Sequence, residues 1–188
     1  GVYCAYNSYY PDVGKSTAAV ASLKKEGAEY IICAFHWGKD ELKYRPSDAQ
    51  TELARACVDA GADLVYGSHA HWLQPIEEYN GSIILYGMGN WSFGGHTAPS
   101  DPDTAIVQIK VKRDIDGAVT NDGYTVISCC VSSDLEGAAA HDNYYNDYRP
   151  TPYAEGTEEY ARAMSKITGA YEGPDGNVDY SDWWASLG

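Results

Sequence analysis

Basic residues are scarce in this sequence of 188 residues, which has 13 Lys and Arg against 27 Asp and Glu and a net charge of −14. Nucleic-acid binding requires Lys and Arg that neutralise phosphates, and adsorption to an anionic membrane requires a similar cluster. The densest basic group, formed by Lys110, Lys112 and Arg113, is typical of a solvated strand face. The charge balance therefore argues against nucleic acid and anionic lipid as partners.

Long apolar segments are also absent, because the longest unbroken run extends only from Tyr30 to Phe35. A membrane-spanning helix requires about 20 apolar residues, so we expect no span in this chain. There is no signal-peptide pattern at Gly1, and any export signal is expected to lie outside the chain. Hydrophobic residues still make up 44% of the sequence, which excludes a disordered acidic tail.

The five cysteines lack the C-x-x-C spacing of zinc and redox sites. They fall mostly in apolar segments and are expected to be buried free thiols. Cys129 and Cys130 are adjacent, and a bridge between them would be strained because neighbouring strand residues point to opposite faces. Cysteine usage does not identify the cellular compartment.

The first half of the chain has the pattern of a βαβ unit. Short apolar segments alternate with segments whose apolar residues recur at helical spacing. Ser16 and Ser47 are expected to cap the two helices, and Ser47 forms a capping box with Gln50. The continuous apolar run from Tyr30 to Phe35 is typical of a parallel strand buried on both faces. The expected strands are Val2–Tyr6, Glu29–Phe35 and Asp63–Tyr66, and the expected helices are Ser16–Glu26 and Ser47–Ala60.

The pattern changes in the second half, where antiparallel strands are expected. Asn80-Gly81 between two apolar segments indicates a type I′ hairpin. Near the C-terminal end, Trp183 and Trp184 are expected to anchor the tail by docking. The expected elements are strands Pro75–Tyr79, Ser82–Tyr86, Thr104–Arg113 and Tyr124–Ser132, followed by a helix over Thr157–Thr168. The sequence thus predicts an α/β (α+β) fold, with a βαβ unit followed by an antiparallel meander.

Three of the five histidines follow expected parallel strands. His36 comes directly after the second strand, and His69 and His71 follow the third. Ligands in open α/β sheets gather beyond the carboxyl ends of parallel strands. An H-x-H pair in extended backbone would place both rings on one side. Three converging imidazoles suit a divalent transition metal such as manganese, zinc or iron, so we predict a metal site there.

Polar residues near these histidines are further candidates for chemistry. Asp40 and Glu41 lie in the loop after His36 and could act as acid/base groups or orient a ligand, or be ordinary loop charges. Asn90 follows a strand in a tight turn and is expected at the same edge. His96 and His141 are expected to be ordinary loop residues.

Several blocks of the sequence together resemble the capsule-synthesis CapA family, the poly-γ-glutamate capsule proteins. The longest block runs from Asp59 to Gly95, and the resemblance covers most of the chain. The other blocks are His36-Trp37-Gly38, Pro46 and Gln50, Pro99–Thr104 and Asn146–Pro152.

This resemblance implies a fold like that of calcineurin-like metallophosphoesterases, with two β-sheets, outer helices and two metals beyond the strand ends. It implies that His36, His69 and His71 are metal ligands, and that Asp40 or Glu41 stands where relatives carry a glutamate. The family's earlier ligand motifs do not occur here. Residues 1–170 therefore resemble the C-terminal half of such a domain, and residues 171–188 form a tail.

The resemblance also implies a role in synthesis or export of poly-γ-glutamate or a related polymer, on the extracellular side of the cell envelope. An anchoring segment would lie outside this chain. Expected partners are a polyanionic polymer or its export machinery, the missing N-terminal half, and a second copy pairing through an open sheet edge. Two alternatives remain: a non-catalytic scaffold or binding component of the polymer assembly, or a folded half-domain whose histidines do nothing alone.

Overall fold

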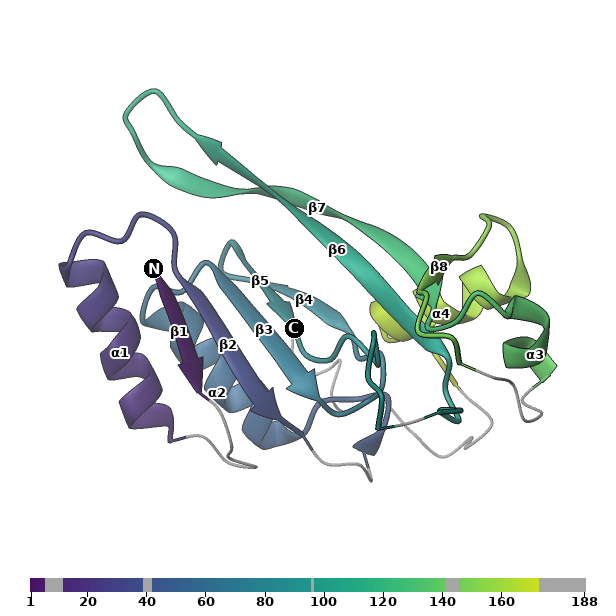
Figure 1. Cartoon of the computed structure of the whole chain (residues 1–188). Helices are drawn as coiled ribbons and strands as arrows, with labels where there is room; N and C mark the ends of the chain where they lie inside the picture. Colours follow the sequence, from purple (N-terminus) through teal and green to yellow (C-terminus); the bar gives the residue numbers. More distant parts are fainter. Residues whose placement is uncertain (6–11, 39–41, 96, 141–145, 173–188) are drawn as a thin grey trace.

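The computed structural model describes residues 1–5, 12–38, 42–95, 97–140 and 146–172. This part of the chain contains two β-sheets and four helices, which confirms the predicted mixed α/β fold (Figure 1). The strands are β1 (Val2–Ala5), β2 (Ile32–Trp37), β3 (Leu64–His69), β4 (Ile76–Tyr79), β5 (Ser82–Leu85), β6 (Asp103–Arg113), β7 (Val119–Cys130) and β8 (Thr151–Pro152). The helices are α1 (Val13–Lys25), α2 (Asp48–Asp59), α3 (Leu135–Ala140) and α4 (Glu158–Thr168).

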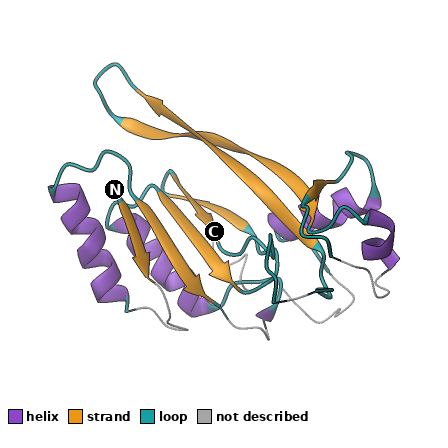
Figure 2. Ribbon diagram, viewed as in Figure 1, coloured by secondary structure: helices purple, strands orange, loops and turns teal. Residues whose placement is uncertain are grey.

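The first sheet has the strand order β1-β2-β3-β5-β4. Its first three strands run parallel, as the βαβ pattern predicted, and β5 also pairs in parallel with β3. Helices α1 and α2 lie together on one side of this sheet (Figure 2). The core between them is built from alternate residues of β2, namely Cys33, Phe35 and Trp37, against buried residues of α2 such as Leu53 and Cys57.

Both helix starts are set by local hydrogen bonds, but only one was predicted correctly. The capping box of Ser47 and Gln50 is present at the start of α2. The prediction that Ser16 caps the first helix was wrong. Asp12 is the N-cap, and its carboxylate accepts a hydrogen bond from the backbone nitrogen of Lys15 at 2.8 Å. Helix α1 therefore begins about one turn earlier, and Ser16 is buried within it.

The prediction that the second strand is buried on both faces was also wrong. Residues of β2 alternate between buried and half-buried, because the helices cover one face fully and the second sheet covers the other only in part. Strands β2 and β3 extend to Trp37 and His69. His36 and His69 consequently belong to the last residues of strands and do not follow them.

The Asn80-Gly81 turn is confirmed, with φ values of 47° and 82° at its two central residues. The strands that follow pair antiparallel, as predicted, and they divide between the two sheets. The β4–β5 hairpin completes the first sheet, and β6, β7 and β8 form a separate antiparallel sheet. The long β6–β7 ribbon lies across the side of the first sheet opposite the helices (Figure 1). The second sheet therefore covers the half-buried face of β2.

Other predictions from the sequence have mixed outcomes. The helix near the end is confirmed as α4, with Thr157 as its N-cap, whereas α3 was not predicted. Four cysteines, Cys33, Cys57, Cys129 and Cys130, are buried free thiols, as expected. Trp183 and Trp184 lie outside the described residues. No helix in the described part of the chain combines the length and apolar character needed to cross a membrane.

Candidate metal site

Strands β2 and β3 bring three imidazoles together at their carboxyl ends. The parallel register places His36 opposite Ser68 and Trp37 opposite His69. The ring centroids of His36 and His69 are 4.5 Å apart, and those of His69 and His71 are 5.7 Å apart. The structure thus gathers the three histidines that the sequence singled out.

The backbone of the H-x-H pair is not extended, which corrects the expected geometry. His69 has a φ of 93° and His71 a φ of 62°. In a continued strand, His69 would share the face of Trp37, which packs toward the helices. The turn in the backbone brings its ring beside His36 instead. Such backbone conformations cost about 1–3 kcal/mol for residues other than glycine and often occur at functional sites.

Gly67 is required where β3 passes Trp37, a constraint that sequence reasoning missed. A Cβ atom at Gly67 would lie 2.2 Å from both Trp37 Nε1 and the carbonyl oxygen of Tyr86. That indole nitrogen donates a hydrogen bond to the same carbonyl at 2.9 Å. Gly67 therefore lets β3 lie close to the indole of Trp37. This close contact sets the position of the strand end that carries His69.

Asn90 lies at this edge, as expected, and contacts His71. Its Oδ1 atom is 2.7 Å from His71 Nδ1, and the side chain of Asn90 is buried. Because a carbonyl oxygen only accepts hydrogen bonds, this contact places the proton of a neutral His71 on Nδ1. The lone pair is then on Nε2, which becomes the nitrogen suited to bind a metal.

The surroundings of His36 favour its neutral form. Burial lowers the pKa of His36 from its ordinary value, and the positive charges that His69 and His71 would carry lower it further. The Oγ atom of Ser68 lies 3.4 Å from His36 Nδ1 and donates to the carbonyl of Phe35. Neutral imidazole is the form that binds metals, so the donor type fits a transition metal.

The carboxylates expected beside the histidines are not available to complete the set. Asp40 and Glu41 lie outside the described residues. Within the described ranges, no group of three or more His, Cys, Asp or Glu side chains is arranged so that it could hold a metal ion. The three imidazoles therefore supply donor types that suit a transition metal, but among the described residues they are not arranged to share one ion, and a complete metal site remains a prediction.

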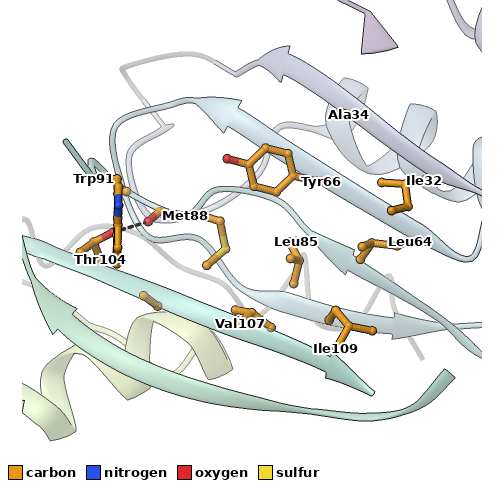
Figure 3. A pocket seen from close by; sticks show the side chains of 12 residues that line it. Ile32, Ala34, Leu64, Tyr66, Leu85, Met88, Trp91, Thr104, Val107 and Ile109 are labelled. Atoms are coloured by element: carbon orange, nitrogen blue, oxygen red, sulfur yellow. Dashed lines mark hydrogen bonds between the residues drawn. The ribbon is translucent and has the colours of Figure 1, made fainter. Parts of the chain in front are cut away.

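An apolar cavity of about 360 Å³ lies between the two sheets (Figure 3). Tyr66, just before Gly67, and Trp91, just after Asn90, line it and are both partly exposed. Phe93 lies near the same edge, with its ring centroid 5.0 Å from that of His71. The sequence analysis did not identify Tyr66, Trp91 and Phe93 as site residues, although they lie close in the sequence to His69 and Asn90. The remaining lining consists mainly of aliphatic side chains from β2, β3, β5 and β6.

Comparisons with known proteins show that the segment carrying these residues is similar to one protein family. Residues 5–94, which include the three histidines and Asn90, match the model of the bacterial capsule synthesis protein PGA_cap. The chain is 44% identical over 93 residues to the PGA biosynthesis protein CapA of Bacillus subtilis, a match that covers 49% of this chain and 24% of that protein.

Two further relatives agree with this match. The capsule biosynthesis protein CapA of Bacillus anthracis is 39% identical over 107 residues, which cover 56% of this chain and 25% of the relative. A probable polyglutamine synthesis accessory protein of Mycobacterium tuberculosis is 33% identical over 101 residues, which cover 51% of this chain and 26% of the relative. The chain thus spans about a quarter of the length of these curated relatives. Residues 5–94, slightly less than half of the chain, are thus similar to the bacterial capsule synthesis protein family PGA_cap.

Proposed function

We propose that this chain is part of a protein for synthesis or export of a capsule polymer, poly-γ-glutamate or a related polyanion, at the extracellular side of the cell envelope. We propose further that it contributes three ligands to a metal site of the phosphoesterase type. The observation that carries the second proposal is the grouping of His36, His69 and His71 at one sheet edge, with Asn90 bound to His71. The names of the curated relatives support the first.

In this proposal, His36, His69 and His71 hold manganese, zinc or iron, and the intact protein holds two such ions. A bound ion would supply Lewis acidity to polarise a phosphoryl or similar group. Asn90 keeps the lone pair of His71 on Nε2, and the lowered pKa of His36 favours its neutral ring. Asp40 or Glu41 would serve as the acid/base group.

Further ligands would come from other parts of the intact protein. In the described part of the chain, β6 has a neighbouring strand, β7, on one side only. An unpaired strand edge readily accepts another strand. We expect a strand of the same protein, or of a second copy, to pair there. A metal between this chain and the polymer would also offset the repulsion between two polyanions, since the chain carries a net charge of −14.

Metal content measured by mass spectrometry tests the site directly. The purified chain, the His69→Ala/His71→Ala double variant and a His141→Ala control are each supplied with manganese, zinc and iron and then desalted. We expect bound metal in the parent chain and in the control, and none in the double variant. Equal metal in all three proteins would contradict the proposed site. No metal in the parent would mean that the three histidines do not bind an ion by themselves, and the same comparison would then be made with the full-length protein, where absence of metal would favour a non-catalytic scaffold.

Activity is tested on the full-length protein, because further ligands are expected outside this chain. We expect hydrolysis of a chromogenic phosphodiester that is lost in His69→Ala and retained in His141→Ala. Polymer binding that survives His69→Ala, without hydrolysis in either protein, would support the scaffold instead.

A further inference from the structure

A buried cluster of charges joins the start of β6 to α4. We call it the Asp103 cluster, and it consists of Asp101, Asp103, Tyr153, Arg162 and Lys166. The carboxylate of Asp103 accepts hydrogen bonds from Tyr153 at 2.8 Å, from two nitrogens of Arg162 at 2.7 and 2.8 Å, and from Lys166 at 2.6 Å. Lys166 also binds the carboxylate of Asp101 at 2.7 Å.

Three charged members of this cluster are almost completely shielded from water, and the side chain of Arg162 is partly exposed. Asp103 is 0% exposed, Lys166 2% and Asp101 4%. Two carboxylates face two cations, so the charges balance, and every oxygen of Asp103 is paired. Separating one partner from such a group would leave an uncompensated buried charge, which is strongly destabilising. The side chains of the cluster are therefore held in one arrangement. The cluster therefore fixes the backbone of residues 101–104 relative to α4.

The backbone fixed in this way packs directly against the turn that carries Asn90. A Cβ atom at Gly89 would lie 2.5 Å from the carbonyl oxygen of Asp103, and Gly89 has a φ of 71°. The hydroxyl of Thr104 donates to the carbonyl of Met88 at 2.9 Å. On the other side of the turn, the nitrogen of Gly89 donates to the carbonyl of Trp72 at 3.1 Å. The turn is thus held between the H-x-H segment and the start of β6.

Asn90 follows this clamped glycine and contacts His71 Nδ1. We propose that Asp103 and Lys166 are positioning residues for the histidine site. By fixing Gly89, they hold the Asn90 carbonyl against His71 and so keep the His71 lone pair on Nε2. The relevance of this tautomer to metal binding rests on the proposed function, whereas the tautomer itself does not.

The first test compares two glycine variants. Gly89→Ala and Gly81→Ala both place alanine at a positive φ, but a Cβ at Gly81 meets open space among the described residues. Both substitutions therefore carry similar backbone strain, and only Gly89→Ala pushes against Asp103. The readout is the ¹⁵N chemical shift of the His71 ring nitrogens at pH 8, where ordinary imidazoles are neutral.

We expect a protonated Nδ1 in the parent and in Gly81→Ala, and a mixture of both tautomers in Gly89→Ala. Thr104→Val, a milder change to the same clamp, is expected to shift the tautomer in the same direction. An unchanged tautomer in both Gly89→Ala and Thr104→Val would overturn the proposal.

The second test examines the buried cluster through Lys166→Met, with Lys112→Met as control. Lys112 pairs with Asp122 on the surface, where the two side chains are 49% and 56% exposed. We expect Lys166→Met to shift the His71 tautomer and to weaken Zn²⁺ affinity about 10- to 100-fold, as loss of supporting contacts does at metal sites. The control should leave both unchanged.

The two proposals fail in different ways. If no variant or parent binds Zn²⁺ but the tautomer shifts, the positioning role stands and the metal site fails. If a folded Lys166→Met variant binds Zn²⁺ as the parent does and keeps the His71 tautomer, the cluster only anchors α4 and the positioning role fails. Should Lys166→Met not fold, the comparison of Gly89→Ala with Gly81→Ala decides the matter, because Gly89→Ala disturbs the contact with Asp103 and retains every charge of the cluster.

Discussion

At the scale of single residues, the pKa of His36 depends on the histidines beside it. Burial is the main cause of its lowered pKa, and His69 and His71 add to the effect. We expect the pKa of His36 to rise part of the way toward its ordinary value in His69→Ala/His71→Ala, as measured by NMR titration. His141→Ala should not change it. A pKa that falls or stays constant in the double variant would show that the rings are not close.

The lowered pKa of His36 also determines how the stability of the protein changes with pH. A histidine whose pKa is lowered in the folded state binds protons more weakly than in the unfolded chain. Its contribution to stability is therefore complete above the ordinary value of 6.5 and is progressively lost as the pH falls below it. The double variant should show a weaker loss of stability between pH 7 and pH 5.

At position 69, glycine should be a more stable replacement than alanine, which reverses the usual order of stability in a strand. The φ of 93° at His69 strains any residue with a Cβ atom. We expect His69→Gly to be more stable than His69→Ala by about 1 kcal/mol in urea denaturation. At His36, which has no positive φ, alanine should be the more stable replacement. The same order at both positions would mean that the turn at His69 relaxes when the imidazole is removed.

At the scale of elements, the spacing of β3 from Trp37 depends on Gly67. A methyl group there would overlap the indole nitrogen and a backbone carbonyl, neither of which can move without displacing a strand. We expect Gly67→Ala to destabilise the protein by about 3 kcal/mol in urea denaturation. Gly94→Ala is the control, because a Cβ at Gly94 meets open space in the described part of the structure. Equal effects of the two substitutions would contradict this packing argument.

Element boundaries show which signals the sequence carries. The capping box at Ser47 and the Asn80-Gly81 turn were predicted because each depends on a few neighbouring residues. The carboxyl ends of β2 and β3 were misplaced because they are set by pairing between the strands. The site consequently gathers the predicted histidines in a bent backbone that the sequence pattern does not indicate.

At the scale of the whole molecule, Asn121 ties the β6–β7 ribbon to the first sheet. It accepts a hydrogen bond from Tyr30 Oη at 2.6 Å and donates to the carbonyls of Asp63 at 2.9 Å and Gly81 at 3.1 Å. Burial, together with the charge of Asp63, raises the pKa of Tyr30 to about 12. This side chain thus links three segments that are distant in the sequence.

We expect Asn121→Ala to destabilise the protein by about 1–3 kcal/mol, since it leaves partly buried polar groups without their partner. Amide hydrogen exchange should also become faster along β6 and β7. Asp122→Ala serves as the control, because its ion pair with Lys112 is exposed and worth about 0–1 kcal/mol. Exchange that stays unchanged in Asn121→Ala would show that other contacts hold the ribbon.

The sequence by itself determined the charge balance, the βαβ order, the local caps and turns, and the presence of three histidines near the ends of parallel strands. These features depend on composition or on residues close together in the chain. The tertiary structure alone decided the contact between Asn90 and His71, the need for glycine at position 67, and the Asp103 cluster. Each of these requires contacts across the fold, such as that between Lys166 and Asp101, which are 65 residues apart. Periodicity and motif spacing describe neighbours along the chain, so they do not specify which distant side chains will meet.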